Sequence, residues 1–298
     1  MKRIILFAAV NIAVLAVITV VVELLGLDRY LAARGVSLTG LLILSAVFGF
    51  GGAFVSLALS KWMAKRAMGV AVIGAPQNAT EHWLLEVVSA HAARLKLDMP
   101  EVGIFESPAM NAFATGARRN AALVAVSSGL LEGMAPEEVR AVLGHEMTHV
   151  ANGDMVTLTL LQGVLNTFVI FLARVVGTAI DGAIGGQRDE RAGGGMFYFF
   201  TVIILQIVFG VLATLIVMAF SRHREYRADV GGAQLAGRNS MIAALQALER
   251  TEVATLPGQF RAFGIAGERM HGLMSRLFMS HPPLPERIAA LQRLPFIG

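Results

Sequence analysis

Two histidines and a glutamate lie close together in the segment His145-Glu146-Met147-Thr148-His149. On a helix, residues four positions apart lie one above the other, so both imidazoles can reach a single ion. Zinc binds such nitrogens. Glu146 would lie beside the metal, where its carboxylate could take a proton from a zinc-bound water as that water attacks a peptide carbonyl. The motif predicts one Zn²⁺ per chain and peptide hydrolysis with Glu146 as general base.

A catalytic zinc site of this type needs a third protein ligand and an open fourth position. Glu225 and Asp229 are also four residues apart, so a helix would present both to one neighbour. We interpret Glu225 as the third ligand and Asp229 as the acceptor for the free ring N–H of a ligand histidine. The alternative is an arginine-rich helix start whose acids offset Arg222, Arg224 and Arg227. The chain has no cysteine, so a thiolate ligand is excluded.

The composition indicates a membrane protein. Of the 298 residues, 55% are hydrophobic and 15% charged, whereas soluble domains have roughly 25% charged residues. The net charge is only +4. The basic residues border apolar runs and are not interleaved with aromatic residues. We therefore expect the lipid bilayer as a partner and no nucleic acid. Nothing resembles a phosphate-binding loop, so we expect no nucleotide.

Four apolar runs approach or exceed the roughly 20 residues that span a bilayer. They cover residues 4–22, 41–60, 156–180 and 197–220. We expect four transmembrane helices arranged as two hairpins. For the first run the alternative is a cleaved signal peptide, and for the last two it is a helical hairpin that enters the membrane only partly.

The positive-inside rule orients these hairpins, because Lys2 and Arg3 precede the first run and further basic residues follow the second and fourth. Both termini and the active site are then cytoplasmic. The predicted organisation is an N-terminal transmembrane hairpin (1–60), a catalytic segment with the histidine motif (61–155), a second transmembrane hairpin (156–220) and a catalytic segment with the third ligand (221–298).

For the parts outside the membrane the sequence predicts helices and a small sheet. We expect a helix from Thr80, as N-cap, to about Leu97, and another from Pro136 to about Asn152 that lacks a strong N-cap. Short strands are expected at 102–105, 109–115 and 122–127. The predicted fold class is a mainly α membrane protein with a cytoplasmic α+β, zincin-like catalytic domain.

Four motifs occur in a characteristic order. They are Ser107-Pro108 with Asn111-Ala112-Phe113-Ala114-Thr115-Gly116, the helix 144–150 followed by Asn152-Gly153-Asp154, the block Glu225-Tyr226-Arg227-Ala228-Asp229, and Ser280-His281-Pro282-Pro283 with Arg287. Together they closely resemble the HtpX family of bacterial membrane-bound zinc metalloproteases, which are M48 peptidases, and more distantly the CAAX-processing Ste24 proteases.

The resemblance implies a multi-pass protein of the bacterial inner membrane that cleaves misfolded or damaged membrane proteins during stress and quality control. By family pattern, His145, His149 and Glu225 match the metal ligands and Glu146 the general base. His281 matches a family histidine near the metal that is expected to stabilise the oxyanion. From the residues alone, His281 before two prolines is more typical of a structural loop histidine.

The resemblance also places the segment of Asn111, Ala112, Phe113, Ala114 and Thr115 beside the active-site cleft. An exposed edge strand can bind an extended substrate by backbone pairing, which suits unfolded proteins. An ordinary structural strand is the alternative.

Two other functions stay open from the sequence. One is a Ste24-like processing protease, which four spans instead of a larger helical enclosure disfavour. The other is a non-catalytic zinc-binding membrane scaffold. Glu146 separates this scaffold from an enzyme, because a purely structural site needs no base beside its ligands.

Overall fold

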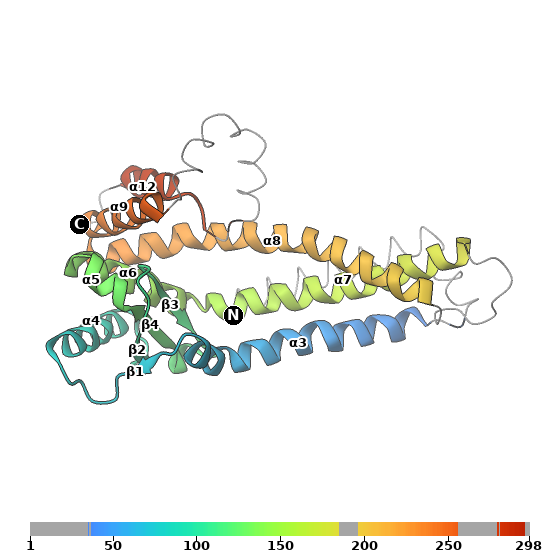
Figure 1. The fold of residues 1–298 in the computed structure, drawn as a ribbon, viewed down its shortest axis with the longest axis horizontal. Helices are drawn as coiled ribbons and strands as arrows, with labels where there is room; N and C mark the ends of the chain where they lie inside the picture. Colours follow the sequence, from blue (N-terminus) through green and yellow to red (C-terminus); the bar gives the residue numbers. More distant parts are fainter. Residues whose placement is uncertain (1–34, 36, 185–195, 256–278, 280, 296–298) are drawn as a thin grey trace. The chain divides into compact units, whose positions relative to one another are not determined.

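The structure, a computed structural model, describes residues 35, 37–184, 196–255, 279 and 281–295 (Figure 1). The first predicted span, 4–22, lies outside these residues. The chain divides into two compact units. The first comprises Met1–Val55 and Thr159–Val217, and the second comprises Ser56–Leu158 and Met218–Gly298.

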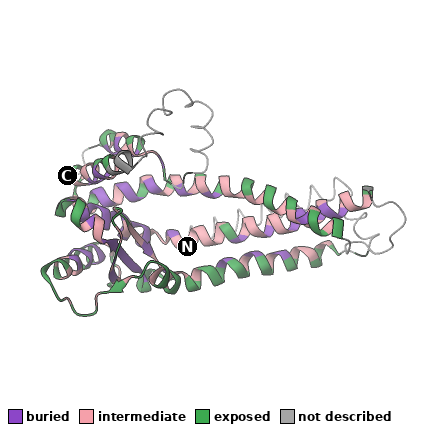
Figure 2. Ribbon diagram, viewed as in Figure 1, coloured by how far each residue is buried: buried purple, intermediate pink, exposed green. Residues whose placement is uncertain are grey.

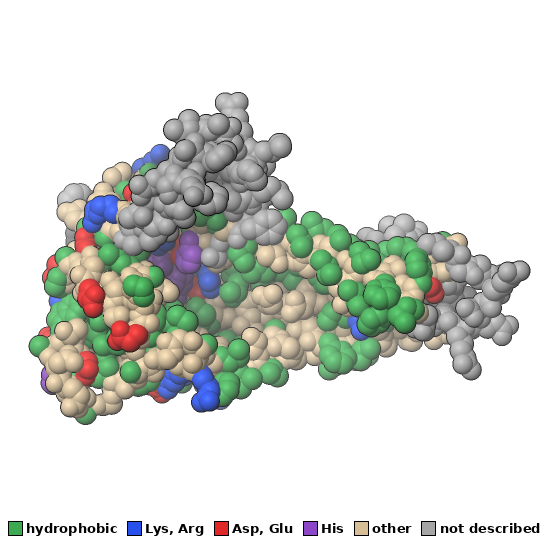
Figure 3. Space-filling view, in the orientation of Figure 1, with side chains coloured by type: hydrophobic (Ala, Val, Ile, Leu, Met, Phe, Trp, Pro, Cys, Tyr) green, Lys and Arg blue, Asp and Glu red, His purple; other side chains and the backbone are tan. Residues whose placement is uncertain are grey.

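Three described helices are long and apolar enough to cross a membrane: α3 (Leu38–Ala67), α7 (Asp154–Ile184) and α8 (Met196–Ala236). They contain the predicted runs 41–60, 156–180 and 197–220. Large apolar side chains on α3 and α8 are exposed, as the green surface of Figure 3 shows. Exposed apolar surface of this extent is stable only against lipid, so the chain is a membrane protein.

Small residues let the helices of the first unit approach closely. Ser45, Gly49 and Ala53 are the buried residues of α3 and recur every four positions. A Cβ at Gly49 would lie 2.9 Å from the Cα of Thr167 in α7. A Cβ at Gly177 of α7 would lie 2.7 Å from the Val202 side chain in α8. Because lipid provides no hydrophobic driving force for helix association, such close backbone packing holds membrane helices together.

The second unit contains a four-stranded mixed sheet in the order β1-β2-β4-β3. The strands are β1 (Ala71–Val72), β2 (Glu101–Phe105), β3 (Ala112–Thr115) and β4 (Leu123–Ser127). β2 and β4 pair in parallel, whereas β1–β2 and β3–β4 are antiparallel. Every residue of β4 is buried, as its apolar composition predicts, and β3 forms an edge of the sheet.

The predicted strand 109–115 is too long at its start. β3 begins at Ala112 because the preceding backbone bonds to a side chain instead of to the strand ladder. The hydroxyl of Ser127 accepts a hydrogen bond from the amide of Asn111 and donates one to the carbonyl of Ala109. Between β3 and β4 lies the 3₁₀ helix η1 (Arg119–Ala121).

Among the described residues, five further α-helices belong to the second unit. They are α4 (Ala79–Leu95), α5 (Ser128–Gly133), α6 (Pro136–Asn152), α9 (Arg238–Thr255) and α12 (Leu284–Arg293). The predicted cap Thr80 is wrong: Asn78 has an extended backbone and its side chain accepts from the amide of Glu81. At the start of α6 the Glu138 carboxylate accepts from the Ala135 amide, which compensates for the missing N-cap side chain.

Helix α6 lies at the centre of this unit, in contact with α4, α9 and β3, and Figure 2 shows it largely buried. The C-terminal part of α8 packs closely against it. A Cβ at Gly232 of α8 would lie 3.1 Å from the amide nitrogen of His145, and one at Gly231 would lie 2.8 Å from the Cβ of Thr148. These glycines let α8 bring its acidic residues to the histidines of α6.

Candidate metal centre

His145 and His149 lie on one face of α6, as their spacing predicts. Their Nε2 atoms are 3.2 Å apart, and both residues are buried. The rings meet edge to face, with centroids 4.8 Å apart. Each imidazole therefore directs its Nε2 atom toward the same point.

Glu225 reaches this point from α8, beyond the apolar run 197–220 of that helix. Its carboxylate oxygens lie 3.4 Å from Nε2 of His145 and 3.3 Å from Nε2 of His149. One ligand atom from each of the three residues lies within 4.8 Å of the others. The residue is fully buried, and its Oε1 makes no hydrogen bond within the described part of the chain.

The opposite ring nitrogens each contact an aspartate. Nδ1 of His145 is 2.9 Å from Asp229, the residue predicted for this position, and Nδ1 of His149 is 2.7 Å from Asp154. Sequence reasoning missed Asp154, which it used only as part of the helix-ending Asn152-Gly153-Asp154 turn. Its place five residues after His149, directly past a glycine that ends the helix, is the signal that could have found it.

Arg287 of α12 is a second residue whose role was missed, although the motif comparison quoted it. Its guanidinium donates two hydrogen bonds to Asp229, of 2.5 and 2.8 Å, and lies 3.9 Å from Glu225. Burial raises the pKa of Asp229, but Arg287 and His145 outweigh burial and hold it below its ordinary value. Arg287 thus keeps a buried carboxylate ionised beside the ligand histidine.

The electrostatics of the cluster favour a cation. Burial lowers the pKa of His149, but the nearby carboxylates of Asp154 and Glu225 outweigh it and raise the pKa to about 9. Burial likewise lowers the pKa of His145, and its bonds to Asp229 and Glu225 raise it above the ordinary value. For Glu225, burial raises the pKa while the histidines hold it well below its usual range. A metal would replace these protons and hold the same carboxylate.

The three residues fit a metal ion. Two Nε2 atoms and one carboxylate form a nitrogen–oxygen donor set, and the buried Oε1 of Glu225 has a vacant hydrogen-bonding capacity that a ligated ion would satisfy. Carboxylates on the far side of both imidazoles are typical of metal-binding histidines.

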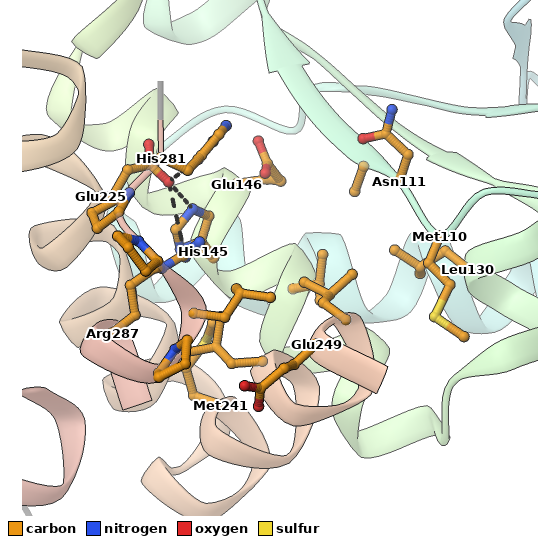
Figure 4. Close-up of a pocket in the computed structure, with 18 of the residues that line it drawn as sticks. Met110, Asn111, Leu130, His145, Glu146, Glu225, Met241, Glu249, His281 and Arg287 are labelled. Carbon is orange, nitrogen blue, oxygen red and sulfur yellow. Dashed lines mark hydrogen bonds and ion pairs between the residues drawn. The ribbon is translucent and has the colours of Figure 1, made fainter. Parts of the chain in front are cut away.

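A cavity of about 470 Å³ adjoins the cluster. His145, Glu146, Glu225, His281 and Arg287 line its polar part (Figure 4). In this view Glu146 lies between the histidine cluster and Asn111, the residue just before β3. Histidine side chains are also visible in a hollow of the face shown in Figure 3. The arrangement brings the predicted base to the wall of a space large enough for a peptide segment.

His281 lies in the same cluster, just before α12. Its Nδ1 is 2.6 Å from Glu225, a contact drawn as a dashed line in Figure 4, and its side chain is 59% exposed. The ring therefore touches a predicted metal ligand and also faces the cavity.

The predicted substrate segment reaches the cavity at one end. Asn111 and Ala112 line it, whereas Phe113 packs against Phe105 with ring centroids 5.6 Å apart. Ala114 is buried, and Thr115 pairs with Leu123 of β4. Another part of the cavity wall is apolar and is formed by Met110, Leu130, Val142, Met241, Leu245 and Leu248.

Comparison with known proteins identifies the family of the chain. The model of peptidase family M48 matches residues 78–294. Protease HtpX of Stenotrophomonas maltophilia (strain R551-3) is 58% identical over 97% of each chain, and the Protease HtpX homolog of Thiobacillus denitrificans is 56% identical over 98% of this chain and 99% of the relative.

The fold is shared with a solved structure, the crystal structure of S. mikatae Ste24p. The TM-score is 0.64 at 17% identity, with 98% of this chain and 67% of that chain covered. The resemblance that the four motifs predict is confirmed. The chain therefore belongs to peptidase family M48 and is a metalloprotease.

Proposed function

We propose that this metalloprotease is a zinc-dependent endopeptidase of the bacterial inner membrane, with its active site in the cytoplasm, that degrades misfolded or damaged membrane proteins. The observation that carries the proposal is the convergence of His145, His149 and Glu225, with Glu146 beside them on the cavity wall.

Zinc is the metal that suits these ligands best. Two histidine nitrogens and one glutamate form the ligand set of several catalytic zinc sites, in which the fourth position stays open for water or substrate. When bound, zinc polarises a carbonyl group and lowers the pKa of water to about 7.

Glu146 supplies the proton transfer. Its carboxylate lines the cavity next to His145, so it can accept a proton from the attacking water and pass that proton to the leaving amine. His281 faces the same cavity, and we assign it the stabilisation of negative charge on the carbonyl oxygen.

The edge strand β3 supports the choice of substrate. It pairs with β4 on one side, and its cavity end at Asn111 and Ala112 adjoins the metal site. An extended peptide that pairs with this edge would lie across Glu146. Backbone pairing depends little on the side chains of the substrate, but it requires an extended segment. Misfolded proteins expose such segments.

The location is supported by the relatives and by charge. The cited relatives are bacterial proteins named Protease HtpX. Lys65 and Arg66 end α3, and Arg222 and Arg224 follow the apolar run of α8. Basic residues at these ends favour the cytoplasmic side. A reporter fused after Gly298 is expected in the cytoplasm, and a periplasmic signal would refute this orientation.

Proteolysis and metal content together test the activity. The full-length protein in detergent, supplied with Zn²⁺, is expected to cleave casein. Glu146→Gln should keep its zinc and lose cleavage by a factor of about 10²–10⁴, because only the base is removed. Glu137→Gln, an exposed substitution on the same helix, is the matched control. Equal cleavage by wild type and Glu146→Gln would refute the mechanism, and zinc binding without cleavage by wild type would indicate a scaffold.

A further inference from the structure

Asp154 lies at the junction of two helices, where α6 ends and α7 begins. Gly153 ends α6 in the left-handed conformation with φ 64°, and its amide bonds back to the carbonyls of His149 and Val150. Asp154 is therefore the first residue of α7, and its side chain turns back toward α6. Its Oδ2 lies 2.7 Å from Nδ1 of His149, and both side chains are 6% exposed.

We propose that Asp154 is a positioning residue that holds His149 in the orientation and tautomer required of a metal ligand. The proposal rests on the metal site assigned above. Asp154 does not reach the position of the ion itself, because it contacts the ring nitrogen opposite to the one that faces His145 and Glu225.

The tautomer follows from this contact. A carboxylate accepts hydrogen bonds and does not donate them, so Nδ1 of His149 must carry the proton. In the neutral ring Nε2 is then the atom with the free lone pair, and it points at Nε2 of His145 and at Glu225. Negative charge on the acceptor also makes the ring a stronger donor to a metal.

Asp154 and Asp229 act on different ligands in different surroundings. Asp229 contacts His145 and also accepts two hydrogen bonds from Arg287, whose positive charge offsets that of the carboxylate. Asp154 forms its ion pair with His149, and its side chain is buried with that ring. We therefore expect the charge of Asp154 to act mainly on His149.

A structural role for Asp154 makes a different prediction. An acidic residue in the first turn of a helix stabilises the helix by interacting with its N-terminal dipole. Loss of that interaction would lower the stability of the metal-free protein and leave its affinity for zinc unchanged. The two roles are thus distinguished by zinc affinity and by metal-free melting temperature.

The test compares the full-length protein with Asp154→Asn and Asp154→Ala, in detergent. Zn²⁺ affinity is measured by competition with a chelator, and the coordination geometry is followed by the visible absorption of the Co²⁺-loaded protein. Asp154→Asn keeps an acceptor oxygen without charge, and Asp154→Ala removes both. Asp98→Asn, an exposed aspartate outside the site, controls for the change in net charge.

We expect Asp154→Asn to bind Zn²⁺ about 10-fold more weakly and Asp154→Ala up to about 100-fold more weakly. The Co²⁺ spectrum of Asp154→Ala should change, and Asp98→Asn should match wild type. Wild-type Zn²⁺ affinity in Asp154→Asn would overturn the proposal, and this outcome is decisive even if Asp154→Ala fails to fold. Failure of the wild type to bind Zn²⁺ would instead overturn the metal site itself.

Discussion

The Nε2 atoms of His145 and His149 lie 3.2 Å apart in a buried site. Both nitrogens lie beside the carboxylate of Glu225, 3.4 and 3.3 Å from its oxygens. A divalent cation in the same space would bind all three groups at once. Metal binding should therefore contribute to the stability of the folded protein as well as to catalysis.

Glu225→Ala should abolish this metal-dependent stabilisation. We expect Zn²⁺ to raise the melting temperature of the wild type. A ligand at a free concentration 100 times its Kd adds about 2.7 kcal/mol to the free energy of unfolding. In Glu225→Ala the zinc content and the thermal shift should both be lost. Thermal unfolding with Zn²⁺ or with a chelator measures the difference. An unchanged zinc content in Glu225→Ala would show that the third ligand is misassigned.

Arg287→Met should destabilise the protein because it leaves the buried Asp229 without its bidentate partner. Removing one member of a buried ion pair costs about 3–5 kcal/mol. Arg287→Lys keeps the charge but not the two parallel hydrogen bonds, so an intermediate loss is expected. Thermal unfolding is the measurement, with the exposed Arg293→Met on the same helix as control. Equal stability of the two methionine variants would contradict this role.

Asn111→Ala should slow cleavage without releasing the metal. Asn111 lines the cavity at the end of β3, outside the group of predicted ligands. Loss of its contacts with a bound peptide should lower kcat/KM by about 10-fold, the effect of about 1.4 kcal/mol. Steady-state cleavage and zinc content are measured together. A loss of zinc in this variant would mean that Asn111 acts through the metal site instead.

The spacing of residues on helices explains why much of the site could be predicted. His145 and His149, and likewise Glu225 and Asp229, are four residues apart, and helical geometry alone places each pair on one face. The membrane topology predicted that the two helices share one side of the bilayer. Their chemical roles stay predictions, but the structure brings these residues together.

Other features depend on contacts that no local pattern contains. Arg287 becomes a partner of the site only when α12 packs beside α8, 58 residues from Asp229 in the sequence. The start of β3 depends on the hydroxyl of Ser127, which is 16 residues from Asn111. Asn78 caps α4 in place of the predicted Thr80; both residue types are good caps, so the backbone geometry decides which of them caps the helix.

Gly49→Ala should weaken the packing of α3 against α7. The added methyl group would meet the backbone of Thr167, which cannot move aside as a side chain can. Overpacking of this kind costs about 1–3 kcal/mol. Gly51→Ala on the same helix is the matched control, because a Cβ at Gly51 meets nothing within 4 Å. The melting temperature in detergent should fall for Gly49→Ala only, and equal values would contradict this packing.

His91 should make the stability sensitive to mild acid. The residue is buried in α4, with Nε2 3.0 Å from the carbonyl oxygen of Arg140 in α6. Burial lowers its pKa below the ordinary 6.5; the Arg140 carbonyl opposes this, and the charges of Arg140 and Arg94 add to it. As the pH falls below about 6.5, the unfolded chain binds a proton that the folded chain does not. The free energy of unfolding should therefore fall until the pH reaches the lowered pKa.

His91→Gln should remove this acid sensitivity, because the glutamine amide can still donate to the Arg140 carbonyl but does not titrate. Melting temperatures of the metal-free protein between about pH 7 and pH 5 measure the effect, with the slope expected to be smaller in His91→Gln than in wild type. His82→Gln removes an exposed histidine from the same helix and should leave the slope unchanged. Since His91 lies outside the metal cluster, the difference should persist with a chelator present. Parallel curves for wild type and His91→Gln would show that other groups cause the loss of stability in acid.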